Sequence, residues 1–149
     1  MSQRRVIIAV MMVSILLLVP AIQGYSGGVY NQASGCNCHS GTAAPGATVS
    51  ISGLPTSYDV NKLYQVTVSV SGGVSGSSGG FSLEVDKGTL STGFGLMLVD
   101  VNSKGDSATH SITGSSYRSW SFEWTSPAAG AGIVTFDVAG MTTNGDGTK

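Results

Sequence analysis

The residues best suited to chemistry in this chain form the run Cys36-Asn37-Cys38-His39, which holds both cysteines and one of the two histidines. Paired thiols followed at once by a histidine are typical of the Cys-x-x-Cys-His run that attaches c-type haem. There the thiols add to the porphyrin, and the histidine nitrogen becomes an axial ligand of the iron. The spacer in this chain is one residue instead of two. We therefore predict covalent haem c at Cys36, Cys38 and His39, held by one thioether or by two.

The second histidine, His110, is the predicted second axial ligand of the iron. A six-coordinate haem takes a further ligand from the protein, commonly a histidine or a methionine. Met97 and Met141 are weaker candidates for that position. Two protein ligands leave no site open for substrate or O₂, so the prediction is a low-spin haem that transfers electrons. Taken without His39, His110 lies in a polar stretch and would be interpreted as a surface or turn histidine.

The same residues also fit chemistries without haem. Cys36 and Cys38 can form a disulfide in an oxidising compartment, although so small a ring strains the bond. With His39 they can bind copper or zinc, and His110 would then have to supply the fourth ligand of a closed zinc site. Each of these interpretations makes the protein a structural or adhesive module instead of an electron carrier.

No motif in the chain indicates an enzyme. A Gly-rich phosphate loop followed by Lys and Ser or Thr is absent from the sequence, and both histidines are already explained by the haem hypothesis. Glu84 and Asp86 form a pair of carboxylates on one predicted strand. They are expected to point to solvent, opposite the apolar Leu83 and Val85, as a solubilising edge. We therefore expect an electron carrier or a structural protein without catalytic residues.

The elements that position these residues begin with an export signal. Two arginines precede an uncharged apolar run over residues 6–19, and small residues follow up to Gly24. This layout predicts a cleaved secretory signal peptide over residues 1–24, with an uncleaved membrane anchor as the alternative. Removing the two arginines leaves 7 − 2 = 5 basic and 8 acidic residues, a net charge of −3. A mature chain without a basic stripe is not expected to bind nucleic acid, so we predict a secreted or cell-surface protein.

After the signal, apolar and polar residues alternate with a period of two in short runs separated by Gly, Pro and Ser. The runs that show it are 48–52, 64–71, 81–86, 119–125 and 134–138. Such runs are typical of antiparallel strands with one wet face, so the prediction is an all-β, immunoglobulin-like antiparallel β-sandwich over residues 47–149. Trp120, Phe122 and Trp124 are its predicted core.

Three stretches depart from this alternation. The run 94–101 is apolar on both faces, which predicts a central strand or one that is buried twice. Residues 25–46, which carry the Cys-x-Cys-His run, lack any core pattern and are predicted to be irregular. The Gly/Ser-rich stretch 72–80 is predicted to be a flexible loop.

Four motifs mark this body of the chain: residues 35–41 (GCNCHSG), 120–127 (WSFEWTSP), 134–140 (VTFDVAG) and 144–147 (NGDG). Together they resemble the Reeler-like domain group and, more narrowly, the prokaryotic "choice-of-anchor V" proteins, over most of residues 25–147. The resemblance implies a secreted Reeler-like β-sandwich, often tethered by a separate C-terminal segment. It also implies a haem near the mature N-terminus, where bacterial members often carry Cys-x-x-Cys-His. A Thr-His pair upstream of the tryptophan strand is a further feature of the group, matched here by Thr109-His110.

The sequence stops soon after Gly147, where members of this group continue into a further strand and an anchor, so either it is a fragment or the sandwich ends early. The second alternative has a consequence for assembly. A sandwich that lacks its last strand keeps an open sheet edge, and such an edge is a template for pairing. We therefore expect the segment after the signal to be donated to a neighbouring subunit as the missing strand. That donation would build a homo-oligomer or filament with haems along it. The redox partners of such an assembly are not identified by the sequence.

Overall fold

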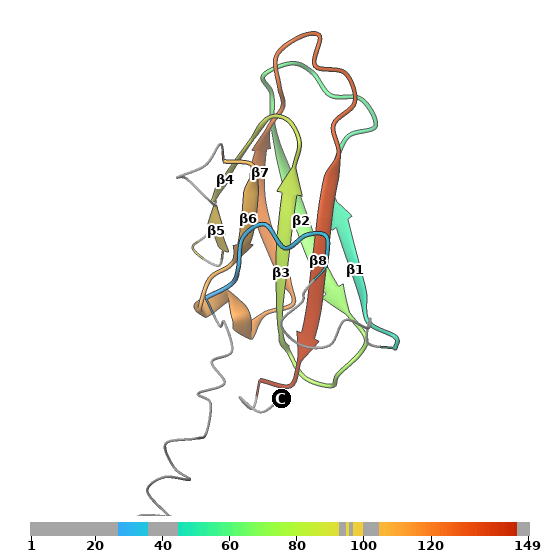
Figure 1. Cartoon of the computed structure of the whole chain (residues 1–149), viewed down its shortest axis with the longest axis vertical. Helices are drawn as coiled ribbons and strands as arrows, with labels where there is room; N and C mark the ends of the chain where they lie inside the picture. Colours follow the sequence, from blue (N-terminus) through green and yellow to red (C-terminus); the bar gives the residue numbers. More distant parts are fainter. Residues whose placement is uncertain (1–26, 36–44, 93–94, 96, 100–104, 146–149) are drawn as a thin grey trace, which may run out of the picture.

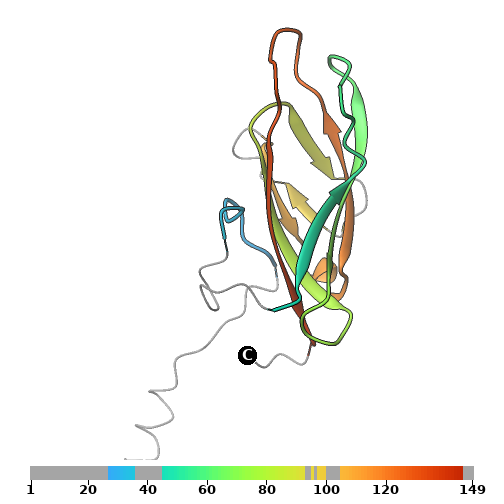
Figure 2. The same cartoon turned by 90° about the vertical axis from the view of Figure 1, so that its right-hand side faces the viewer.

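The computed structural model describes residues 27–35, 45–92, 95, 97–99 and 105–145. Over these residues the chain forms two antiparallel four-stranded sheets packed face to face as a β-sandwich (Figure 1 and Figure 2). The first sheet has the order β1-β2-β7-β4 and the second the order β5-β6-β3-β8. The predicted all-β fold is therefore confirmed. The elements are β1 (Thr48–Ser52), β2 (Leu63–Ser71), β3 (Ser78–Val85), β4 (Thr89–Thr92), β5 (Met97–Val99), β6 (Ser107–His110), the 3-10 helix η1 (Thr113–Ser116), β7 (Ser119–Thr125) and β8 (Phe136–Thr143).

The core between the sheets is built by the apolar residues that alternate along the predicted strands. Its members on three central strands are Val66, Val68 and Val70 (β2), Phe81, Leu83 and Val85 (β3), and Trp120, Phe122 and Trp124 (β7). β2 and β7 pair along their length, with Val66 opposite Phe122 and Val68 opposite Trp120. A slip of one residue would turn all of these side chains to solvent, so the apolar pattern sets the register. The predicted core role of the three aromatic residues of β7 is confirmed.

The prediction of a central strand over residues 94–101 is wrong, while the alternative of a strand buried on both faces stays a prediction. Among the described residues of this run, Met97–Val99 form β5, which lies at the edge of the second sheet beside β6. Gly95 has a φ of +68°, a left-handed conformation that glycine adopts at little cost and an extended strand cannot contain. The strand therefore begins after this glycine. Met97 is still buried and contributes to the core.

The Gly/Ser-rich stretch 72–80 is a loop only in part. β3 begins at Ser78, and its next two residues, Gly79 and Gly80, are buried. A Cβ at Gly79 would come within 2.8 Å of the Met141 carbonyl oxygen, and one at Gly80 within 2.6 Å of the His110 ring. Both positions require glycine because neighbouring groups fill the space. The composition suggests a flexible loop, but close packing is the reason for glycine at these two positions.

Alternation does not predict two of the strands, β4 and β6. β4 pairs with β7 and places Leu90 opposite Trp124. β6 pairs with β3 on one side and β5 on the other, and all four of its residues are buried although three of them are polar. β8 begins at Phe136, two residues later than the predicted run, and continues to Thr143. The burial of β6 depends on a further segment that covers its outer face.

Candidate functional site

Three of the four predicted site residues, Cys36, Cys38 and His39, lie outside the described residues, as does the predicted signal peptide over residues 1–24. Within the described ranges, no group of three or more His, Cys, Asp or Glu side chains is placed to hold a metal ion. The same part of the chain contains no helix with the length and apolar character needed to cross a bilayer. The described segment that leads into the motif ends at Gly35.

Residues 27–35 cross the outer face of the second sheet, in front of β6 and β3, as the blue ribbon in Figure 1 shows. We call this segment the strap. It forms no strand, and its own backbone N–H groups attach it to side chains of the sheet. On β6, the Val29 N–H donates to Thr109 Oγ1 (3.1 Å) and the Asn31 N–H donates to Ser107 Oγ (3.2 Å). The first half of the strap is thus attached to β6.

The second half of the strap is attached to β3 in the same way. The Gln32 N–H donates to Ser82 Oγ (3.1 Å), and the Ala33 N–H donates to a carboxylate oxygen of Glu84 (3.0 Å). The three hydroxyl-bearing acceptors are at most 3% exposed, so the strap shields them from water. We call the four acceptors the receptor face. Its residues are Ser82, Glu84, Ser107 and Thr109.

The receptor face is absent from the sites predicted from the sequence. Its one signal is the run Ser107-Ala108-Thr109, where two hydroxyls flank an apolar residue, and this run is too short to indicate a strand. Glu84 was expected to face solvent, and it is half-buried beneath the strap. Asp86 is exposed as expected, and its carboxylate accepts the Thr135 N–H (2.7 Å). That hydrogen bond stabilises the charged form and holds the pKa of Asp86 below its ordinary value.

The start of the strap fits the receptor face closely. Gly28 has a φ of +75°, and a Cβ there would lie 2.3 Å from Thr109 Oγ1 and 2.4 Å from the His110 carbonyl oxygen. Glycine is therefore required for both its conformation and its size. At the other end, a turn closes the strap, because the Gly35 N–H donates to the Gln32 carbonyl oxygen (3.2 Å). The strap lies on the outside of the sandwich (Figure 2).

Gly28→Ala is expected to release the strap and leave the sandwich folded. The added methyl group overlaps the receptor face, so amide hydrogen exchange at Val29 and Ala33 should accelerate about tenfold or more, while core amides such as Val68 keep their rates. Gly130→Ala is the matched control. Gly130 also has a positive φ, +85°, but no atom lies within 4 Å of its Cβ position. Equal exchange rates in the two variants would contradict the close fit.

His110 is a buried residue of β6, so its interpretation as a surface or turn histidine is wrong. It is 8% exposed, and its Nδ1 accepts the backbone N–H of Phe81 (3.2 Å). Its ring lies near two core aromatic rings, with centroid distances of 6.4 Å to Phe81 and 6.3 Å to Trp120. Gly80 leaves the space that the ring occupies. His110 therefore connects β6 to β3 through its side chain.

This environment does not fit iron ligation by His110. A backbone N–H can only donate, so Nδ1 accepts in this hydrogen bond; the Phe81 carbonyl oxygen lies 3.4 Å from the same nitrogen and would be its acceptor in the other tautomer. Histidine binds a metal through an unprotonated nitrogen and usually donates its other ring N–H to an acceptor. The obstacle to ligation is burial, because the ring is 8% exposed and lies near the rings of Phe81 and Trp120. Axial ligation by His110 stays a prediction, and it requires the ring to leave the place that it occupies here.

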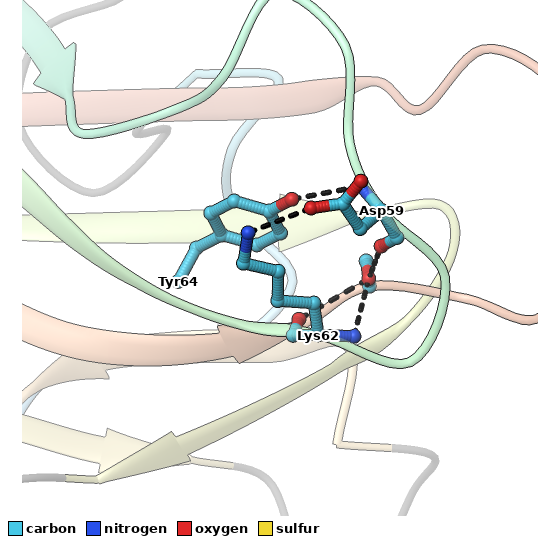
Figure 3. Close-up of polar contacts among 4 residues, drawn as sticks. Asp59, Lys62 and Tyr64 are labelled. Atoms are coloured by element: carbon cyan, nitrogen blue, oxygen red, sulfur yellow. Dashed lines mark hydrogen bonds and ion pairs between the residues drawn. The ribbon is translucent and has the colours of Figure 1, made fainter.

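A separate polar cluster closes the loop that precedes β2 (Figure 3). The Lys62 amine pairs with the Asp59 carboxylate (2.6 Å) and lies 5.4 Å from the centre of the Tyr64 ring. The Asp59 N–H donates to the Tyr64 hydroxyl (2.8 Å), and the Lys62 N–H donates to Ser126 Oγ (2.9 Å). The hydrogen bond that the Lys62 amine donates to the Asp59 carboxylate raises the pKa of Lys62. These groups bond to one another and to the backbone, so the cluster fixes a turn.

The fold and the strap define the class of protein as an antiparallel β-sandwich domain. No family model matches the chain, and no curated protein matches it. Among solved structures, the chain is similar to the Reelin-N domain of F-spondin, with a TM-score of 0.50 and 17% identity over 80% of this chain and 81% of that one. It is also similar to the human F-spondin reeler domain (fragment 1), with a TM-score of 0.50 and 17% identity over 79% of this chain and 82% of that one. The chain has a Reeler-like fold, as the resemblance implied.

Proposed function

We propose that the protein is an exported β-sandwich that carries haem c on Cys36, Cys38 and His39 and transfers electrons at or outside the cell surface. The observation that supports this most is the path of the strap, which brings the chain to Gly35 on the outside of the second sheet. The Cys-x-Cys-His motif follows at the next residue. A group as large as a porphyrin attached there does not require the core to open.

The roles of the three residues follow from their chemistry. Cys36, Cys38 or both would hold the haem through thioether bonds, in which a thiol gives its sulfur to one carbon of a vinyl group and its proton to the other. His39, directly after Cys38, offers a ring nitrogen to the iron. The haem supplies one-electron oxidation and reduction when it is bound. The strap fixes the start of the motif relative to the sandwich through the hydrogen bond from the Ala33 N–H to Glu84.

The burial of the candidate residues bears on the choice of the second axial ligand. The bis-His form requires His110 to give up the Phe81 N–H and to leave the core. Met97 is 2% exposed and would also have to leave the core. Met141 is half-buried on β8, so its use as a ligand would disturb the core less. We therefore propose Met141 or a residue outside the described ranges as the second ligand.

A visible spectrum of protein matured by a periplasmic haem-attachment system tests the proposal. We expect sharp reduced-haem bands that survive acid-acetone extraction and an intact mass raised by one haem. The double variant Cys36→Ser/Cys38→Ser should lose both signals, while Ser34→Ala, a change just outside the motif, should keep them. Mass analysis of the single cysteine variants distinguishes one thioether from two. A folded wild-type protein without haem bands would overturn the proposal.

The second candidate function is a structural or adhesive surface domain with the cysteines in a disulfide or a metal site. The observation that favours it is the complete hydrogen bonding of the buried polar side chains in the described part of the sandwich. Among the described residues, every buried side-chain polar atom has a hydrogen-bond partner, so this part of the fold needs no cofactor to complete it. Mass measurement of the haem-free protein before and after reduction and chelation distinguishes a disulfide from a bound metal ion.

A further inference from the structure

We infer that the receptor face is a docking site for an extended uncharged segment, and that the strap of a second copy of this chain can occupy it. Two copies would then be linked by reciprocal exchange of straps. The inference does not depend on haem, because it uses only residues 27–35 and the outer face of β6 and β3.

The receptor face presents acceptor oxygens to a passing backbone. Thr109 Oγ1 donates its own proton to the Phe81 carbonyl oxygen (2.7 Å), which leaves its lone pairs for the Val29 N–H. Glu84, when ionised, can only accept. All four contacts use backbone N–H groups of the strap. A segment supplied by another chain can offer the same donors, as peptides do when they dock on a sheet through their main chain.

The fit of the strap selects its own sequence over other peptides. The strap, GGVYNQASG, has no charged residue, which suits a face whose one charge is the Glu84 carboxylate. An acidic segment would be repelled there. The position next to Thr109 accepts only glycine, because a Cβ at Gly28 would overlap both Thr109 Oγ1 and the His110 carbonyl oxygen. The strap of another copy has these properties.

The attachment of the strap is weak enough to open while the sandwich stays folded. It includes four hydrogen bonds to the receptor face, each worth about 0.5–1.5 kcal/mol, and one buried apolar side chain, Ala33. Such a segment opens at a free energy below that of global unfolding. Exchange between two copies rebuilds the same contacts, which makes swapping a low-cost route to a dimer.

The length of chain after the strap permits this exchange. Residues 36–47 separate Gly35 from β1, and a segment of that length spans up to roughly 40 Å when extended. In its own chain the strap competes at an effective concentration of about millimolar. Exchange therefore needs comparable crowding, such as a dense surface layer. It differs from strand donation to a sheet edge, because the strap crosses the face of the sheet and joins no strand.

Cross-linking between two different variants tests the inference. One chain carries Ala33→Cys, the other carries Glu84→Cys, and both carry Cys36→Ser and Cys38→Ser so that no other thiol reacts. The two are mixed at about millimolar concentration, and a short bismaleimide joins thiols that meet. We expect a covalent heterodimer, and the synthetic peptide of residues 27–35 should compete with it.

The control pairs Ala33→Cys with Glu123→Cys, since Glu123 is also a half-buried glutamate but lies on the outer face of the first sheet. The heterodimer yield with Glu84→Cys should exceed the control yield about tenfold or more, as for a specific site over random collision. A chain that carries both Ala33→Cys and Glu84→Cys should cross-link as a monomer in dilute solution. If this chain reacts while the mixed pair yields no more than the control, the strap docks only in its own chain and the inference is wrong.

Discussion

Trp120→Ala is expected to lower the free energy of unfolding by about 3–5 kcal/mol, a large part of the about 5–15 kcal/mol available to a domain. Trp120 lies on β7, a central strand of the first sheet, and is 1% exposed. Its ring centroid is 4.8 Å from that of Phe81 on the opposite sheet. Its Nε1 donates to the Gly114 carbonyl oxygen of η1 (2.9 Å). Truncation opens a cavity between the sheets and leaves that carbonyl without this donor.

Urea denaturation of the wild type and the variant measures the loss as a lower midpoint with an unchanged slope. Trp120→Phe keeps an aromatic ring beside Phe81 and loses the indole N–H, so an intermediate loss is expected. Ser121→Ala is the control on the same strand, because it removes only a hydroxyl that pairs with Thr67 (2.9 Å) on the outer face. That control should cost about 1 kcal/mol or less. A loss for Trp120→Ala no larger than the control's would contradict packing of this indole between the sheets.

The strands that the sequence predicts best are those with one face in water. On β2 and β7, the outward residues remain exposed or half-buried, while the inward ones are buried except for the half-buried Tyr64. The two environments impose opposite requirements on successive residues, so a period of two is visible in the sequence. The alternation therefore predicts these strands of the first sheet, and it also predicts the aromatic core residues of β7.

The second sheet was less predictable because the strap covers part of its outer face. Ser107 and Thr109 are buried and polar, and their stability comes from N–H groups that lie 76 and 80 residues away in sequence. A hydrogen bond across such a separation leaves no local pattern, so the polar strand β6 resembles a loop. The same reasoning applies to Gly79 and Gly80, whose size is set by groups on β8 and β6.

One part of the candidate site is likewise predictable from local sequence, and another part is not. The Cys-x-Cys-His motif is visible in the sequence because its chemistry depends on residue types at adjacent positions. The environment of His110 is not visible, since Phe81 on β3 and Trp120 on β7 determine it. Counting histidines therefore suggests a pair of axial ligands, whereas the contacts of His110 suggest a structural role. A double-mutant cycle between Gly80 and His110 distinguishes these two roles.

Gly80→Ala is expected to cost about 1–3 kcal/mol of stability, as overpacking of a filled core does, and to lose most of that cost in a His110→Ala background. A Cβ at Gly80 would lie 2.6 Å from Cε1 and 2.9 Å from Nδ1 of the His110 ring. The backbone at Gly80 is not left-handed, so the ring opposes alanine there and the conformation does not. Without the ring, alanine fits, and its smaller loss of backbone entropy favours the strand.

The double-mutant cycle measures this coupling, expected at about 1–3 kcal/mol, by denaturation of the wild type, the two single variants and the double variant. Gly79→Ala is the matched control. Its Cβ would meet the Met141 carbonyl oxygen at 2.8 Å and not the histidine, so its cost should add to that of His110→Ala. If the stability costs of Gly80→Ala and His110→Ala were also additive, the His110 ring would not lie against Gly80.

The same cycle, repeated on haem-loaded protein, reports where the ring lies when the cofactor is attached. A histidine bound to iron would have to move away from Gly80, and alanine would then cost nothing at that position. We expect equal coupling in the loaded and haem-free forms, because the Phe81 N–H and the surrounding core hold the ring in both. Coupling that disappears on loading would instead identify His110 as the second axial ligand, with electron transfer through a bis-His iron.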